Sequence, residues 1–111
     1  MAVALILAAC TAGHIERLPY RDASLILPRE QVVAFKKRAW QGDGEAAYEL
    51  FWHYSWGLKD DARGEPWLRL ANRLGSSSAK RYIAEWRRQQ PEQCLKFERQ
   101  HKLPKPHDVS P

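Results

Sequence analysis

The stretch Gly-Asp-Gly-Glu-Ala at residues 42–46, followed by Leu50, decides the fold because its pattern recurs later in the chain. The second copy is Gly-Ser-Ser-Ser-Ala at residues 75–79, followed by Ile83, so the two copies are offset by 33 residues (75 minus 42). In each copy an alanine stands four residues, and an aliphatic residue eight residues, after the first glycine. A period of this length is typical of stacked helix pairs, in which each unit buries its apolar face against the next. The sequence therefore predicts a small all-helical protein.

Hydrophobic periodicity predicts about five helices around these two glycines. Pro28 suits the first turn of a helix, Asp43 is a good N-cap, and glycine is common just after a helix end. The segment 58–65 is polar and is expected to be a turn, with Pro66 beginning the helix that follows. The predicted helices cover approximately residues 28–41, 43–57, 66–75, 76–88 and 91–101.

The second predicted helix is apolar on two faces. Its main face repeats at steps of three and four residues and consists of Ala46, Ala47, Leu50, Phe51 and Tyr54. A second stripe repeats every four residues and consists of Tyr48, Trp52 and Trp56. The polar side is left with Glu45, Glu49 and His53. In the third predicted helix, the residues expected to point outward are Arg69, Asn72 and Arg73.

The stripe of Tyr48, Trp52 and Trp56, with His53 beside it, is a candidate partner-binding surface. Tryptophan and tyrosine dominate the energetics of protein interfaces. The alternative is that this stripe packs on Trp40 of the preceding helix or on the C-terminal helix, since a central helix of a repeat array has two buried sides. For His53 the alternatives are a solvated polar face and an acid–base site formed by an i, i+4 pair with Glu49.

A second candidate surface is the basic face of the fourth predicted helix, formed by Lys80, Arg81, Arg87 and Arg88. Such a face either holds phosphates of lipid or nucleic acid, or is simply solvated. The whole chain carries 18 Lys and Arg against 13 Asp and Glu, a net charge of +5, with the acids interspersed. Because nucleic-acid binders more often concentrate basic residues on one face, no nucleic acid is expected as a partner.

Nine positions between residues 42 and 86 resemble the Sel1-like repeat, a relative of the tetratricopeptide repeat. They occur in the family's order and are Ala47, Leu50, Tyr54, Gly57, Asp61, Trp67, Ala71, Gly75 and Ala79. Phe51 departs from the pattern, where a small residue is usual, and Gly64 departs where alanine is usual. The resemblance implies a short right-handed α/α solenoid that binds proteins or peptides and catalyses nothing. Because about three repeats are needed for independent stability, the flanking helices are expected to act as caps, or the protein to self-associate.

The N-terminus predicts a lipid anchor. Residues 1–9 are apolar and too short to span a bilayer, which takes about 20 residues in a helix. Residues 7–10, Leu-Ala-Ala-Cys, resemble the lipobox of bacterial lipoproteins, in which the cysteine is acylated; here that residue is Cys10. Thr11 follows it where an inner-membrane retention signal usually has aspartate, which by analogy favours the outer membrane, facing the periplasm. The run has no preceding Lys or Arg, and the alternative is a buried apolar segment of a cytosolic protein.

This anchor divides the chain into a signal peptide at residues 1–9, a tether at 10–27, a repeat domain at 28–102 and a proline-rich extended tail at 103–111. Within the tether, residues 25–27 are apolar and are expected to tuck back onto the first helix. If Cys10 is acylated, Cys94 remains a free thiol. A bridge between Cys10 and Cys94 is the alternative in an oxidising compartment.

The sequence predicts no catalytic chemistry. The histidines lie apart from cysteines and from each other, so no metal-ligand spacing occurs. Neither a phosphate-binding glycine pattern nor a nucleophile elbow is present. No enzyme activity, metal, cofactor or small-molecule substrate is therefore expected.

The leading hypothesis is a membrane-anchored periplasmic lipoprotein that binds a protein partner through its helices. Within that class, small Sel1-like lipoproteins resemble immunity proteins encoded beside secreted toxins. One alternative is a cytosolic helical-repeat adaptor, or a basic nucleic-acid-associated protein, in which residues 1–9 are a buried apolar segment and not a signal peptide. Another is a structural envelope protein that pairs with itself through the aromatic stripe.

Overall fold

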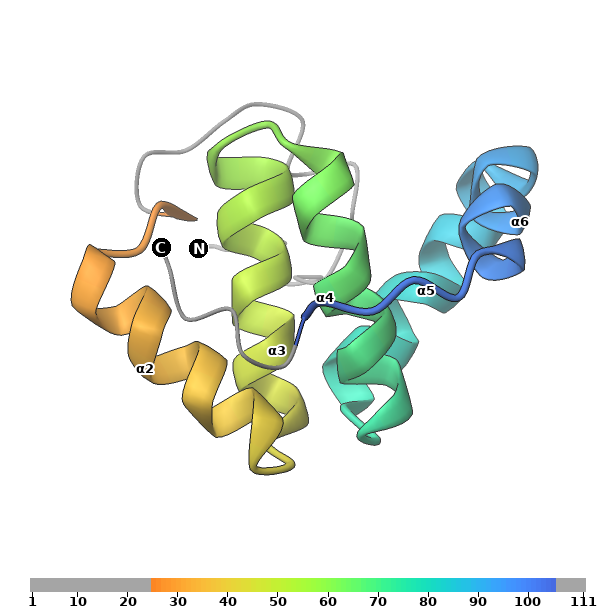
Figure 1. The fold of residues 1–111 in the computed structure, drawn as a ribbon. Helices are drawn as coiled ribbons and strands as arrows, with labels where there is room; N and C mark the ends of the chain where they lie inside the picture. The colour runs from red at the N-terminus through yellow and green to blue at the C-terminus, as the bar shows by residue number, and fades with distance from the viewer. Residues whose placement is uncertain (1–24, 106–111) are drawn as a thin grey trace, which may run out of the picture.

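The computed structural model describes residues 25–105, and all regular structure in that range is helical (Figure 1). The elements are α2 (Arg29–Trp40), α3 (Gly44–Phe51), η3 (Trp52–Gly57), α4 (Asp61–Arg73), α5 (Ser77–Gln89) and α6 (Pro91–Arg99). The element η3 continues α3 without a break as a π-helix, so residues 25–105 form five helical rods and no strand. The predicted all-α fold of about five helices is confirmed. The predicted signal peptide, Cys10, most of the tether and the end of the tail lie outside the described residues.

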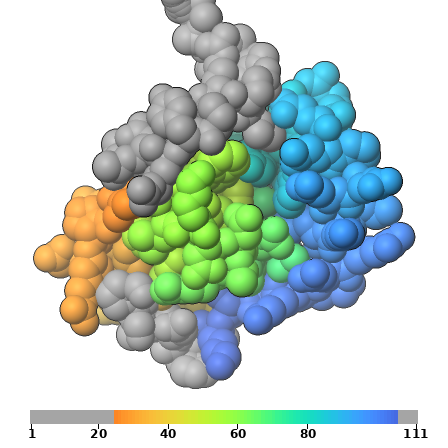
Figure 2. Space-filling view, turned by 90° about the horizontal axis from the view of Figure 1, so that it is seen from above, coloured from red at the N-terminus to blue at the C-terminus, as the bar shows by residue number. Residues whose placement is uncertain are grey.

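The helices are arranged as neighbours in chain order. In Figure 1, α3 stands between α2 and α4, and the pair α5–α6 extends away from the far side of α4. Figure 2, seen from above, has the connection from η3 to α4 at its centre, with α2 on one side and α5 and α6 on the other. After α6 the chain turns back across α4, where Leu103 packs on the core.

The two glycines of the 33-residue pattern end their helices in the same way. Gly42 has a φ of +104° and Gly75 a φ of +90°, a conformation that favours glycine because it has no Cβ. At the first glycine, the N–H of Asp43 donates to the carbonyl of Arg38, which closes the helix end. At the second, the N–H of Ser76 donates to the carbonyl of Ala71, and both members of this bond are displaced by 33 residues from the first pair. The repeat in the sequence is therefore a repeat in the backbone.

The next helix of each copy also begins in the same way. The Asp43 side chain accepts the N–H of Ala46 at 3.1 Å, and the Ser76 hydroxyl accepts the N–H of Ala79 at 3.0 Å. The two helix starts lie side by side, because the Ser76 hydroxyl donates to the Glu45 carboxylate at 2.7 Å. Helix α5 is thus stacked beside α3 as the corresponding member of the next repeat.

The core lies between α3, α4 and the first turns of α5. The side chains with no more than 1% exposure in these helices are Ala46, Ala47, Leu50, Leu68, Ala71 and Ala79. Complete burial of one leucine side chain is worth about 1.5–3 kcal/mol. These buried leucines and alanines therefore contribute much of the free energy that stabilises the fold. At the other end, Trp40 of α2 meets Trp67 of α4 edge to face, with ring centroids 6.3 Å apart.

Helix α4 begins at Asp61, five residues before the predicted start, and the expected turn at 58–65 is wrong over most of its length. The side chain of Asp60 is the N-cap, accepting the N–H of Arg63 at 3.2 Å. Pro66 therefore lies inside the helix, where it cannot donate a backbone hydrogen bond. The cap and the burial of Gly64 against η3 hold the additional turn despite the proline.

Candidate functional site

The aromatic stripe of α3 and η3 packs against α5. The rings of Tyr48 and Trp52 meet that of Tyr82 edge to face, with centroids 6.4 Å and 5.4 Å apart. The indole N–H of Trp56 donates to the Tyr82 hydroxyl at 3.1 Å. This packing resembles the predicted alternative of a buried stripe, but its neighbour is α5 instead of Trp40 or the C-terminal helix. All three stripe residues remain half-buried, so each keeps some surface for a partner.

A cleft opens beside this stripe, between η3 and the start of α4 on one side and α5–α6 on the other. We call it the aromatic cleft; it has a volume of about 520 Å³. Its aromatic wall consists of Phe51, Trp56, Tyr82 and Trp86. Its rim is polar and includes Asp61, Glu65, Gln89, Gln90 and Gln93. Burial raises the pKa of the Tyr82 hydroxyl well above its usual value, so this group stays a neutral hydrogen-bonding group.

His53 is not on a polar face. It is only 4% exposed, and its Nδ1 atom accepts the backbone N–H of Leu27 at 2.9 Å. The expectation that it is solvated is therefore wrong, and the described residues contain no hydrogen bond between it and Glu49. Its spacing in the sequence was the overlooked signal: Ala46, Leu50 and His53 stand at i, i+4 and i+7, so the histidine falls on the apolar face.

The segment at residues 25–27 packs on η3, a contact not predicted from the sequence. A Cβ built at Gly57 lies 3.0 Å from the Ile26 side chain and 3.3 Å from the carbonyl of Leu25. The small residue at position 57 thus lets this segment approach, and the bond from Leu27 to His53 fixes it. The structure places His53 in this attachment and not in the aromatic cleft.

The attachment predicts a loss of stability in mild acid. Desolvation lowers the pKa of His53 below 6.5, with the positive charges of Arg63 and Lys36 adding to it. The unfolded chain then binds more protons than the folded one as the pH falls below about 6.5, so the free energy of unfolding must decrease there. For one proton the decrease is at most about 1.4 kcal/mol per pH unit. Urea unfolding between pH 7.5 and 5 measures it.

The matched variants are His53→Leu, which removes the buried imidazole, and His101→Leu, which removes an exposed one. We expect the first to flatten the pH dependence below 6.5 and the second to leave it unchanged. An unaltered profile in His53→Leu would assign the acid sensitivity to other groups.

The four predicted basic residues do not form one surface. Lys80 and Arg87 stand seven residues apart on one face of α5, and both line a second cleft. Arg81 and Arg88 lie on another face, where Arg88 pairs with Glu85. Tyr82 and Trp86 occupy the side of α5 that borders the aromatic cleft.

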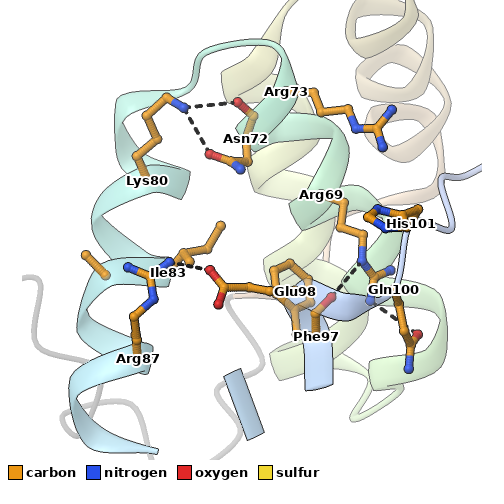
Figure 3. Close-up of a pocket in the computed structure, with 11 residues that line it drawn as sticks. Arg69, Asn72, Arg73, Lys80, Ile83, Arg87, Phe97, Glu98, Gln100 and His101 are labelled. Carbon is orange, nitrogen blue, oxygen red and sulfur yellow. Dashed lines mark hydrogen bonds and ion pairs between the residues drawn. The ribbon is translucent and has the colours of Figure 1, made fainter. Parts of the chain in front are cut away.

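The second cleft, which we call the basic cleft, has a volume of about 440 Å³ and lies between α4, α5 and the end of α6 (Figure 3). Lys80 donates to the backbone oxygen and to Oδ1 of Asn72 at 3.3 Å and 3.0 Å. Arg87 pairs with Glu98 of α6. Arg73 lines the cleft as well, and among residues 25–105 it has no hydrogen-bond or ion-pair partner.

Arg69 is buried, so the prediction that it points outward is wrong. It is 7% exposed and lies at the base of the basic cleft, with its guanidinium stacked 4.5 Å above the ring of Phe97. The signal in the sequence was Lys36, which precedes Arg69 by one repeat period of 33 residues and is itself 2% exposed over the ring of Tyr54. Each copy of the repeat buries a cation at this position. Arg69 therefore belongs to the packing between α4 and the chain after α6.

Within residues 25–105, no three histidine, cysteine or acidic side chains gather as a metal site would require. No helix in the same range has both the length and the apolar character needed to cross a membrane. The thiol of Cys94 is buried, with its sulfur 3.8 Å from the carbonyl oxygen of Ile83, while its possible disulfide partner Cys10 lies outside the described residues. Comparisons with models of protein families, with curated proteins and with solved structures find no match to this chain.

Proposed function

We propose that this protein is a helical-repeat module that binds a protein partner at the aromatic cleft. The observation that carries the proposal is the half-buried row of Trp52, Trp56 and Tyr82 beside a cleft of about 520 Å³. Interface hot spots usually contain tryptophan and tyrosine at a partly desolvated centre that is surrounded by polar groups.

The chemistry of the rim favours a protein over a small apolar ligand. Three glutamine side chains, Gln89, Gln90 and Gln93, border the aromatic wall together with the carboxylates of Asp61 and Glu65. Amides donate and accept hydrogen bonds, so this rim suits the mixed donors and acceptors of a polypeptide. Burial raises the pKa of Glu65, which means that its carboxylate is partly desolvated. A hydrogen bond from a partner's donor to this carboxylate would therefore stabilise the complex.

The proposal includes a location. The lipobox-like residues 7–10 support acylation of Cys10 and attachment of the module to the outer membrane, facing the periplasm. The resemblance to Sel1-like repeats supports a scaffold role, and an immunity protein for a secreted toxin is the most specific partner class within it. Metabolic labelling with radioactive palmitate tests the anchor: the wild type should incorporate label and Cys10→Ala should not. Label that persists in Cys10→Ala would remove the lipoprotein assignment.

The binding surface is tested by mixing the purified protein with the product of the neighbouring gene in a calorimeter. We expect a heteromeric complex of nanomolar affinity, and we expect Trp56→Ala to weaken it about 30-fold, as loss of a hot-spot residue of about 2 kcal/mol requires. Leu95→Ala is the matched control, because Leu95 is an exposed apolar residue of α6 that does not line the cleft.

Equal weakening by Leu95→Ala and Trp56→Ala would contradict the assignment of the aromatic cleft. Sedimentation of the isolated protein separates the remaining alternative, in which two copies pair through the stripe. Dimers that Trp52→Ala converts to monomers would replace the heteromeric proposal with self-association.

A further inference from the structure

The basic cleft has an excess of positive charge that the described chain does not neutralise. Among its lining residues, Arg69, Arg73, Lys80 and Arg87 are cations and Glu98 is the acid. Glu98 is paired with Arg87, and the oxygens that Lys80 contacts belong to the neutral side chain and backbone of Asn72. Arg73 and Lys80 therefore lie on either side of Asn72, each without a carboxylate partner among residues 25–105 (Figure 3).

Not every cation in the cleft is available to a ligand. Arg69 uses its donors on the backbone oxygens of Phe97 and Lys102 and on the side chain of Gln100. It holds the base of the cleft in place, and its guanidinium is also paired with the Glu65 carboxylate at 3.6 Å, so it offers no free contact. The groups that can meet a ligand are those of the two walls, Arg73 on α4 and Lys80 and Arg87 on α5.

The spacing of these groups indicates an extended ligand. Lys80 and Arg87 are separated by two turns of α5, which is about 10 Å at 1.5 Å per residue. The surface between them is apolar and is formed by Ile83, Ala84 and the ring of Phe97. A single phosphate needs donors that converge on one point, whereas these cations lie at the two ends of an apolar base. In a peptide with the extended polyproline II conformation, which has three residues per turn and rises about 3.1 Å per residue, side chains three residues apart lie on the same edge about 9 Å apart.

We propose that the basic cleft binds an extended acidic segment of a protein partner, with two carboxylates three residues apart and an apolar side chain between them. One carboxylate contacts Lys80, and the charge of Arg73 on the facing wall attracts it. The other contacts Arg87 and displaces Glu98 from it. The proposal rests on the proposed protein-binding function and adds the chemistry of a second contact, on the face of α5 opposite to the aromatic cleft.

The probe is a fluorescein-labelled, amidated hexapeptide, Ser-Glu-Leu-Val-Glu-Ser, compared by fluorescence polarisation with its counterpart in which both glutamates are glutamines. We expect the acidic peptide to bind at least tenfold more tightly at 50 mM salt, with an affinity that falls as salt increases. Arg73→Glu and Lys80→Glu should each weaken it at least tenfold. Glu98→Gln should strengthen binding of the acidic peptide, because the peptide then no longer competes with the Glu98 carboxylate for Arg87.

The matched controls are Arg29→Glu and Lys37→Glu, which make the same charge change at exposed positions of α2. Equal binding of the two peptides, or equal weakening by the α2 variants, would overturn the proposal. Inorganic phosphate and phosphatidylglycerol vesicles are tested in parallel, and binding of either that depends on Arg73 while the acidic peptide does not bind would also overturn it. Circular dichroism of every variant establishes that it is folded.

The failure of this proposal is distinguishable from failure of the proposed function. Trp56→Ala removes a wall of the aromatic cleft and leaves the basic cleft unchanged, so it should bind the acidic peptide as the wild type does. If the peptide does not bind but the partner complex still requires Trp56, the aromatic cleft stands and the basic cleft is only a solvated face.

Discussion

Gly64→Ala should lower the free energy of unfolding by about 3 kcal/mol, at the upper end of the usual effect of overpacking a tight contact. A Cβ built at Gly64 lies 1.9 Å from the hydroxyl oxygen of Ser55, and 2.9 Å from both the Cβ and the backbone nitrogen of that residue. Rotation of the hydroxyl relieves the first contact only. The other two require α4 and η3 to separate, and both elements are buried at this point.

The double variant tests this explanation. The Ser55 hydroxyl has no hydrogen-bond partner among the described residues, so Ser55→Ala alone should be nearly neutral. Combined with Gly64→Ala, Ser55→Ala removes the oxygen contact and should recover part of the loss. Ser55→Gly removes the Cβ as well and should relieve more of the clash, although glycine in a helix itself costs about 1 kcal/mol.

Urea unfolding at 25 °C measures these differences, and a loss of 3 kcal/mol should lower the melting temperature by more than about 10 °C. Gly42→Ala is the control for a glycine whose built Cβ meets nothing within 4 Å, so its effect is limited to the strain of a positive φ. Additive effects of Gly64→Ala and Ser55→Ala, with no recovery, would show that the two residues do not clash.

Local signals in the sequence were sufficient for the framework of the fold. Gly42 and Gly75 end their helices with a positive φ, which glycine adopts more easily than other residues do. The side-chain oxygens of Asp43 and Ser76 cap the helices that follow. These are interactions between residues at most five apart, so a sequence pattern contains all that is needed to recognise them.

Contacts between helices were not predictable in the same way. Gly64 has no side chain because Ser55, nine residues earlier in the π-helix η3, packs against its backbone. The sequence of residues 52–57 contains no glycine or proline before Gly57 that would announce such a segment. Both clefts are formed by the way α5 packs against α4. The hydrophobic pattern of either helix alone does not determine that packing.

The errors at the candidate sites have one physical cause. Polarity alone assigns His53 and Arg69 to the solvent side, but both side chains are buried, as is Lys36. A polar side chain can be buried when its donors and acceptors are satisfied, and satisfaction depends on distant residues. Helical spacing placed His53 on the apolar face, and the 33-residue period linked Lys36 to Arg69. Periodicity was the better guide at these positions.

Arg69→Met should destabilise the protein by about 3 kcal/mol, since a charged group that makes one buried and two partly buried hydrogen bonds contributes more than a neutral one. Methionine keeps the length and the apolar stem of the side chain, so the loss reports the guanidinium and not the packing. The bonds that disappear are those to the Phe97 oxygen at 3.3 Å, the Lys102 oxygen at 3.1 Å and the Gln100 side chain at 3.3 Å. The Glu65 carboxylate, 3.6 Å from the guanidinium, also loses its partner.

Arg73→Met is the matched control, because it removes the same charge one turn further along α4 from an exposed side chain with no partner among residues 25–105. Surface substitutions of this kind usually change stability by no more than about 0.5 kcal/mol. Arg69→Lys should fall between the two, since an ammonium group keeps the charge but cannot span three acceptors that the planar guanidinium reaches together.

Hydrogen exchange distinguishes a general loss of stability from a local one. If Arg69 fixes the returning chain to α4, then in Arg69→Met the amides of residues 97–103 should exchange faster by a larger factor than those of α3. Uniform acceleration over all helices would mean that Arg69 stabilises only the shared core. A local effect would make the base of the basic cleft dependent on this one buried cation, because Phe97, Gln100 and His101 line that cleft and are held to α4 through it. Arg69→Met should then weaken the binding of the acidic peptide, even though Arg69 itself does not contact the peptide.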